Sequence, residues 1–201
     1  ICIKKNLKSL TIGKKNSNLL IKKHEYLGNF QKVEIEFNKK KYFFSTSLIG
    51  KIQIKNLLFS ILAANKSRIK FEKIIKSIEK IKPIDGRLEN IGKIKNNSKV
   101  ILDYAHTPGA LKCALESLKD QFPLSKISIV FGCGGNRDKI KRPTMGKIAN
   151  QYCNQIFLTD DNPRYENPKK IRNEIKKKVD SSKLIEISSR KKAIEIAIKN
   201  L

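Results

Sequence analysis

The sequence between Ser128 and Arg164, SIVFGCGGNRDKIKRPTMGKIANQYCNQIFLTDDNPR, determines how the surrounding chain is organised. A β-prone run from Ser128 to Phe131 leads into a cluster of glycines, and a helical pattern begins at Pro143. The apolar run from Ile156 to Thr159 is typical of a buried strand. This order of strand, turn, helix and strand predicts an α/β unit with parallel strands.

Polar residues follow both of these strands. Residues 136–142 come after the first strand and its glycines, and residues 160–164 come directly after the second. In open α/β sheets the ligand crevice lies at the carboxyl ends of such strands. Guanidinium, amide and carboxylate groups gathered there can hold a zwitterion, because each ligand charge meets a matching partner.

The β-α alternation continues on both sides of this stretch. Strands are expected at 99–102 and 184–187, and helices at 108–118, 167–179 and 190–201. Repeated alternation over residues 99–201 favours a mostly parallel sheet with helices on both faces.

The first part of the chain has a different pattern. Alternation of apolar and charged residues over 32–37, a polar turn at 38–41 and the apolar return at 42–44 predict a β-hairpin. We place His24 in the loop before this hairpin, as a surface residue rather than a metal ligand, since no cysteine or second histidine is near it.

Two helices are expected next, at 48–64 and 71–81. The second ends before Pro83, because the residue preceding a proline avoids the α region. Residues 83–86 therefore form the expected boundary between two domains, 1–85 and 86–201.

The formal net charge of +26 would ordinarily suggest a polyanionic partner. However, the chain has 37 Lys against 7 Arg and 30 Ile against 4 Val, the preferences of an AT-rich genome. The lysines are scattered and are not interleaved with aromatic residues as in single-strand binders. A solvated basic surface is the favoured interpretation, and a basic nucleic-acid-binding module is the alternative.

The remaining composition excludes several classes of site. The four cysteines, Cys2, Cys113, Cys133 and Cys153, form no C-x-x-C pair, so we expect no zinc site and a reduced, cytoplasmic compartment. No apolar run is long enough to cross a membrane, and no signal peptide is present.

The motif FGCGGNRDKxKRP followed by TDDNPR closely resembles the Mur ligases, and the resemblance extends over the whole chain. It is most similar to the members that add meso-diaminopimelate to UDP-N-acetylmuramoyl-L-alanyl-D-glutamate. The implied fold is a Rossmann-like C-terminal domain with a mostly parallel sheet at 86–201. The α/β tail of an ATP-binding central domain would precede it, at 1–85.

The resemblance implies an amino-acid site in the central motif. Its residues would bind meso-diaminopimelate, and they are Arg137, Asp161, Asn162, Pro163 and Arg164. A surface pair between Arg164 and Glu166 is the alternative for that arginine. Lys141 and Arg142 are expected to be structural or phosphate-facing, and Cys133 to be a packing residue.

The resemblance also implies residues on the ATP side, namely Asn56, Arg87, Asp103 and His106. Gln53 stands where the family has a further asparagine. Arg87 lies in a G-R-x-E motif, and a surface pair with Glu89 is its alternative. For His106 a purely structural role is equally compatible with the sequence.

The implied activity is amide-bond formation through an acyl phosphate, with ATP and Mg²⁺ as cofactors. The substrates would be the nucleotide precursor and meso-diaminopimelate, and we expect a monomer with neither nucleic acid nor membrane as partner. Relatives that add lysine, or glutamate to folate, are the alternatives, and the DDNPR cluster disfavours the folate case.

Several family features lie outside this sequence. It contains no G-x-x-G-K-[ST] phosphate loop, and the family's magnesium ligands, carbamylated lysine and G-K-G-H-E stretch are also missing. We therefore interpret the chain as a fragment, and we assign it no catalytic residue and no metal ligand.

This interpretation predicts that the 201-residue chain alone releases no phosphate from ATP in a substrate-dependent way. A phosphate-release assay with the nucleotide precursor and diaminopimelate checks it, with heat-inactivated chain as the background. Substrate-dependent release above that background would contradict the interpretation.

Overall fold

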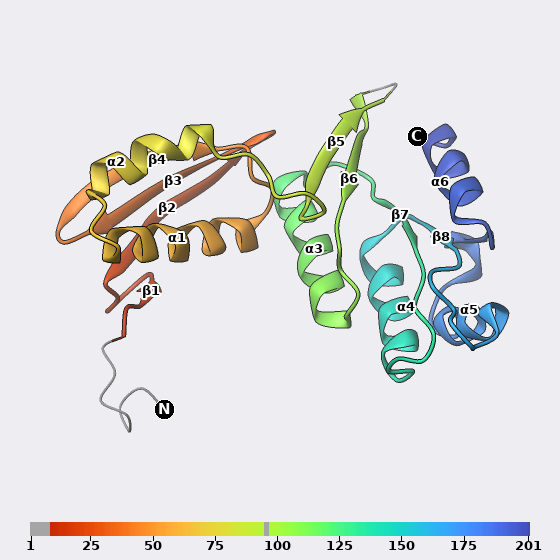
Figure 1. Ribbon diagram of the computed structural model, residues 1–201. Helices are drawn as coiled ribbons and strands as arrows, with labels where there is room; N and C mark the ends of the chain where they lie inside the picture. Colours follow the sequence, from red (N-terminus) through yellow and green to blue (C-terminus); the bar gives the residue numbers. More distant parts are fainter. Residues whose placement is uncertain (1–8, 95–96) are drawn as a thin grey trace. The chain divides into compact units, whose positions relative to one another are not determined.

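The computed structural model describes residues 9–94 and 97–201 of the chain (Figure 1). The chain divides into two compact units, Ile1–Glu89 and Asn90–Leu201. Each unit is described by itself below. Cys2 lies outside the described residues.

The first unit consists of a sheet in the order β1-β2-β3-β4 and the helices that follow it (Figure 1). Its strands are β1 (Ile12–Gly13), β2 (Leu19–Leu27), β3 (Phe30–Phe37) and β4 (Lys40–Thr46). Its helices are α1 (Lys51–Lys66), α2 (Phe71–Ser77) and the 3-10 turn η1 (Ile78–Lys80).

The predicted hairpin is confirmed, since β3 and β4 pair in antiparallel fashion with Ile35 opposite Tyr42. Its turn is tighter than expected. Asn38 and Lys39 have φ angles of 50° and 61°, so the chain reverses over these residues. Positive φ at successive turn positions matches the right-handed twist of the flanking strands.

The placement of His24 in a loop was wrong. His24 lies in β2, and its Nε2 is 2.7 Å from Oε1 of the buried Gln31. The register of β2 against β3 shifts between Ile21 and Lys23. Such a bulge interrupts the period-two pattern by which a strand is identified from sequence.

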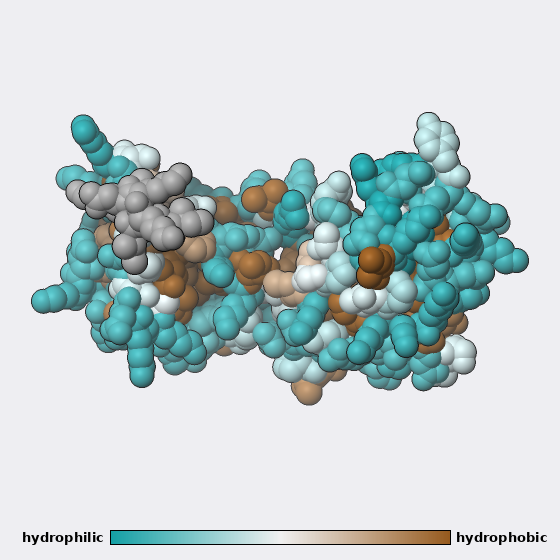
Figure 2. All heavy atoms as spheres, turned by 90° about the horizontal axis from the view of Figure 1, so that it is seen from below, coloured by the Kyte–Doolittle hydropathy of each residue, from teal (hydrophilic) through white to brown (hydrophobic). Residues whose placement is uncertain are grey.

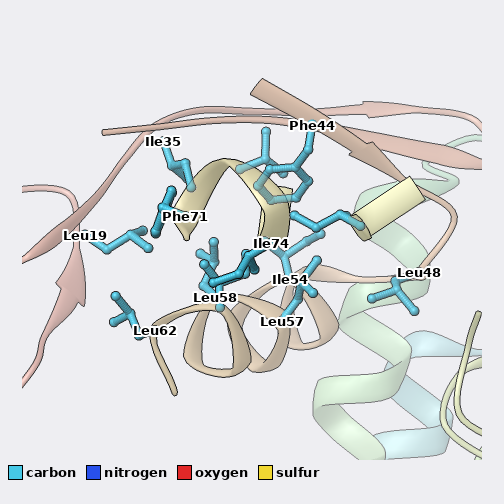
Figure 3. Packing of buried hydrophobic residues seen from close by; sticks show 13 residues of the cluster. Leu19, Ile35, Phe44, Leu48, Ile54, Leu57, Leu58, Leu62, Phe71 and Ile74 are labelled. Carbon is cyan, nitrogen blue, oxygen red and sulfur yellow. The ribbon is translucent and has the colours of Figure 1, made fainter. Parts of the chain in front are cut away.

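One face of this sheet packs on α1 and α2 (Figure 3). Ile35 and Leu58 are fully buried, and Phe37 stacks on Phe71 with ring centroids 4.4 Å apart. Burying a large apolar side chain contributes roughly 1.5–3 kcal/mol relative to leaving it exposed. The alternating apolar residues of the hairpin therefore supply the sheet side of this core.

The second unit contains the strands β5 (Glu89–Lys93), β6 (Lys99–Leu102), β7 (Ser128–Phe131), β8 (Gln155–Leu158) and β9 (Leu184–Glu186). Its helices are α3 (Pro108–Gln121), α4 (Lys141–Tyr152), α5 (Pro168–Lys176), the 3-10 turn η3 (Ser181–Lys183) and α6 (Arg190–Lys199).

The strands β7, β8 and β9 form a parallel sheet in that order, as the sequence predicts. The strand expected at 99–102 is present as β6, but it pairs with β5, which the sequence analysis did not identify. A parallel sheet places the ends of β7 and β8 side by side, with Phe131 opposite Leu158.

The core of this unit lies between the β7-β8-β9 sheet and its helices, with Met145 and Ala149 of α4 buried. Helices α4 and α5 approach very closely at Gly146. A Cβ added to Gly146 would lie 2.1 Å from the carbonyl oxygen of Ile175. A glycine is therefore required at this crossing.

Hydrophilic side chains dominate the face of the molecule drawn in Figure 2, in accordance with the scattered lysines of the sequence. Within residues 9–94 and 97–201, none of the helices combines the length and the apolar character needed to cross a membrane.

The crossing at Gly146 generates a stability prediction. Gly146→Ala is expected to destabilise the protein by about 1–3 kcal/mol, because the added methyl group collides with backbone that cannot move freely. Chemical denaturation followed by circular dichroism measures this change.

Gly109→Ala is the matched control, since Gly109 is also helical and an added Cβ meets nothing within 4 Å. This variant should be neutral or stabilised by up to about 1 kcal/mol through helix propensity. If Gly146→Ala and Gly109→Ala changed the free energy of unfolding equally, the close crossing of α4 and α5 would not constrain the helices.

Candidate ligand-binding site

Two loops meet at the carboxyl ends of β7 and β8. The first, residues 132–136, is called the glycine turn here, and the second, residues 159–166, the acidic loop. The backbone N–H of Thr159 donates to the carbonyl of Phe131 at 3.0 Å, and that of Gly135 donates to Asn162 at 2.8 Å. The structure thus brings together the two polar clusters of the sequence.

Glycine is required in this turn because the two backbones nearly touch. A Cβ on Gly132 would lie 2.2 Å from the carbonyl oxygen of Thr159. A Cβ on Gly135 would lie 1.9 Å from the carbonyl oxygen of Pro163. Any larger residue at either position would separate the loops, so the glycines serve loop-to-loop contact.

Asn136 joins the loops through both its side chain and its backbone. Its Oδ1 accepts from the N–H of Tyr165 at 3.1 Å, and its own N–H donates to the Glu166 carboxylate at 2.5 Å. Its φ angle is 50°, a left-handed conformation that asparagine tolerates better than most residues. The sequence analysis did not single out Asn136.

Arg164 is exposed, and its side chain lies against the glycine turn. Its Nη1 donates to the carbonyl of Gly135 at 2.7 Å, and its backbone N–H donates to Oδ1 of Asn162 at 3.3 Å. Its φ angle is 49°, so its backbone is left-handed as well. A guanidinium carries five N–H donors, so donors remain for a ligand carboxylate.

Glu166 pairs with Arg142 rather than with Arg164, so the alternative of an Arg164–Glu166 surface pair is wrong. Both terminal nitrogens of Arg142 donate to the Glu166 carboxylate at 3.0 Å. Arg142 also donates to Glu174 at 2.8 Å and to the carbonyl of Gly134 at 3.2 Å. Its side chain is fully buried.

The hydrogen bond from Arg142 lowers the pKa of Glu166 to about 2 from an ordinary value of 4.5. The backbone N–H of Asn136 acts in the same direction. Because folding lowers the pKa of Glu166, its ionised carboxylate stabilises the fold at pH values above about 4.5. This contribution disappears as the pH falls from about 4.5 towards 2. The pair is therefore fully ionised at neutral pH.

Two further arginines that the sequence analysis did not assign lie beside the acidic loop. Arg190, at the start of α6, is 3.7 Å from the carboxylate of Asp161. Arg172 of α5 contacts Asp160 and donates to Glu186 at 2.8 Å. Only the tertiary fold places these residues here, since Arg172 lies within the following helix α5 and Arg190 lies beyond both α5 and β9.

Arg137 follows the glycine turn directly and is exposed. Lys141 donates from Nζ to the carbonyl of His106 at 2.8 Å, which fixes the turn after β6 beside the start of α4. In that turn Oδ1 of Asp103 accepts from the N–H of Ala105 at 2.9 Å. The ring of His106 lies edge-on to that of Tyr104, with centroids 5.3 Å apart.

The other candidate nucleotide-side residues lie in the first unit. Nδ2 of Asn56 is 3.4 Å from Oε1 of Gln53, whose Nε2 donates to the carbonyl of Arg87 at 3.0 Å. The carboxylate of Glu89 accepts from the N–H of Gly86 at 2.7 Å. Gln53 therefore connects α1 to the turn that carries Arg87.

Residues 9–94 and 97–201 contain no cluster of three or more His, Cys, Asp or Glu side chains that could hold a metal ion. Burial raises the pKa of Cys133 to about 11 and that of Cys153 to about 12. Both thiols are thus protonated at neutral pH and suited to packing rather than to nucleophilic chemistry.

Comparison with known proteins yields relatives along the whole chain. The chain is 42% identical over 197 residues to the UDP-N-acetylmuramoyl-L-alanyl-D-glutamate–2,6-diaminopimelate ligase of Rickettsia felis. This match covers 98% of the chain but 36% of the relative. The chain thus spans little more than a third of that protein's length.

Solved structures of related ligases share the fold. A 2,6-diaminopimelate ligase superposes with a TM-score of 0.64 at 29% identity, covering 94% of this chain and 39% of that one. The folylpolyglutamate synthase of Mycobacterium tuberculosis superposes with a TM-score of 0.79 at 13% identity. It covers 99% of this chain and 44% of that one, and at such low identity it shows the fold alone.

The family model described as "Mur ligase, glutamate ligase domain" matches residues 86–201. This stretch includes both loops of the site, the turn after β6 and all of the parallel sheet. Because the match extends over more than half of the sequence, the chain belongs to the Mur ligase family.

Proposed function

We propose that the enzyme containing this chain is an ATP-dependent ligase that adds meso-diaminopimelate to UDP-N-acetylmuramoyl-L-alanyl-D-glutamate in peptidoglycan synthesis. The observation that carries the proposal is the exposed residue Arg164, whose guanidinium is oriented by Gly135 at the meeting point of two loops. The names of the relatives supply the reaction.

The same proposal covers the domains. We assign residues 1–85 to the end of a central, ATP-binding domain and residues 86–201 to most of a C-terminal domain. The family match over 86–201 and the separate unit Asn90–Leu201 support this assignment.

The chemistry of the site suits diaminopimelate. This amino acid carries a carboxylate and an ammonium group at each end, so it needs both anionic and cationic partners. We assign Arg137 and Arg164 to its carboxylates, with Asp161 and Asn162 beside them to receive an ammonium group. Pro163 fixes φ between Asn162 and Arg164. A carboxylate left unpaired once water is excluded would cost several kcal/mol.

On the nucleotide side, we assign ATP to Asn56, Arg87, Asp103 and His106. The amide of Asn56 fits the polar edge of a purine, and the carboxylate of Asp103 fits a ribose diol. The guanidinium of Arg87 fits phosphate oxygens. The same proposal includes Mg²⁺ as the ion that accompanies ATP. It also includes a cytoplasmic location and a monomeric state. They rest on the family resemblance.

A lysine-adding ligase is the second candidate, because it would use the same fold. Lysine lacks the second carboxylate of diaminopimelate, so a site that selects lysine does not need an arginine in the position of Arg164. A hydrogen bond and a left-handed backbone hold the positively charged side chain of Arg164 in place. A fixed positive charge at this position favours diaminopimelate, the ligand with the additional carboxylate.

The proposal predicts the effect of Arg164→Ala in the full-length enzyme. Diaminopimelate use should lose roughly 2–5 kcal/mol of apparent transition-state stabilisation, while lysine use changes little. Arg164→Lys should restore part of the loss, since an ammonium cannot form two parallel hydrogen bonds. Steady-state kcat/KM values for both amino acids measure this selectivity.

Arg68→Ala is the matched control, because Arg68 is exposed, belongs to the first unit and also has a positive φ, 67°. It should leave the ratio of diaminopimelate to lysine use as in the wild type. The assignment of Arg164 is falsified if Arg164→Ala also leaves that ratio unchanged.

A further inference from the structure

We propose that Arg142, Glu166 and Asn136 form a positioning unit that sets the affinity of the site for diaminopimelate without touching the ligand. The unit holds the acidic loop against the glycine turn in the register that presents the Arg164 guanidinium. This inference rests on the proposed function and deepens it, since it names residues that control how the substrate is selected.

The first support is that Arg164 is fixed on both sides along the chain. Before it, the carbonyl of Asn162 accepts from Gly135 at 2.8 Å. After it, Tyr165 donates its N–H to Asn136 at 3.1 Å, and Glu166 accepts from the N–H of Asn136 at 2.5 Å. Every one of these contacts ends on the glycine turn.

The second support is the backbone conformation of Arg164. A φ angle of 49° is unfavourable for a residue with a Cβ, so the surroundings must impose it. If the contacts after Arg164 were lost, the backbone could relax to negative φ. The guanidinium would then leave the carbonyl of Gly135, and its donors would no longer be aimed at one place.

The third support is the position of Arg142, which has no exposed surface and so cannot contact a bound ligand. Its guanidinium donates to the side chain of Glu166 and to the carbonyl of Gly134. It therefore links the two loops directly. A residue in this place acts on the substrate through Arg164.

A purely structural role makes a different prediction, because general destabilisation would affect all substrates alike. Glu166→Gln tests this in the full-length enzyme, since it keeps the side-chain shape and removes the charge. We expect the KM for diaminopimelate to rise roughly tenfold, the effect of losing a hydrogen bond to a charged group. The KM values for ATP and the nucleotide precursor, and kcat at saturating diaminopimelate, should stay close to wild type.

A pair of substitutions at Asn136 tests the second contact while Arg142, Glu166 and Glu174 all stay in place. Asn136→Gly permits the positive φ but removes the acceptor for Tyr165, so the KM for diaminopimelate should rise several-fold. Asn136→Asp retains an acceptor oxygen and should stay close to wild type. The Asn136 pair keeps the proposal testable even if Glu166→Gln fails to fold.

Tyr152→Phe is the stability control. It removes a hydrogen bond of 2.7 Å to Glu116 at the other end of α4, away from both loops. It should lower the melting temperature without changing the KM for diaminopimelate.

The outcomes separate the two proposals. If wild-type enzyme does not use diaminopimelate, or Arg164→Ala has no effect on its use, the proposed function fails and this inference fails with it. If Arg164→Ala acts as expected but Glu166→Gln and Asn136→Gly leave the KM for diaminopimelate unchanged, only the positioning unit is overturned. Equal increases in the KM of all three substrates would overturn it too, in favour of a structural role.

Discussion

The site depends on one buried positive charge, the guanidinium of Arg142. Moving a charge out of water is costly unless partners replace its hydration, and here Glu166, Glu174 and the carbonyl of Gly134 do so for the two terminal nitrogens. Among the described residues the buried Nε finds no partner. Such a network contributes little net stability, but removing one partner leaves an unpaired buried charge. Its main effect is therefore geometric, because the partners come from different segments and must all reach the same side chain.

That constraint explains the unusual backbone around it. The loops can share the guanidinium only if they nearly touch, which requires glycine at Gly132 and Gly135. The same two loops hold Asn136 and Arg164 at positive φ angles. The local strain is offset by hydrogen bonds that Asn136 and Arg164 make between the loops.

Local patterns were enough to predict much of the fold. Strand β7 has the predicted bounds and α4 begins close to its predicted start, because apolar periodicity and proline positions act within a few residues. Strand β2 was missed because a bulge interrupts its alternation, and the pairing of β6 with β5 is a non-local choice. Likewise, the candidate loops were found as motifs, but the partners of Arg142 and Asp161 come from other segments.

Arginine and lysine differ in exposure and in the number of acceptors they contact in this chain. Lysine ion pairs of this chain, such as Lys23–Glu25 and Lys40–Glu72, lie at exposed positions where a solvated point charge suffices. Arg142 and Arg172 instead bridge more than one acceptor with little exposure. A lysine in place of Arg142 could not offer a planar fork to a carboxylate and still reach the carbonyl of Gly134. At Arg142 and Arg172, hydrogen-bond geometry, and not charge alone, therefore favours arginine over lysine.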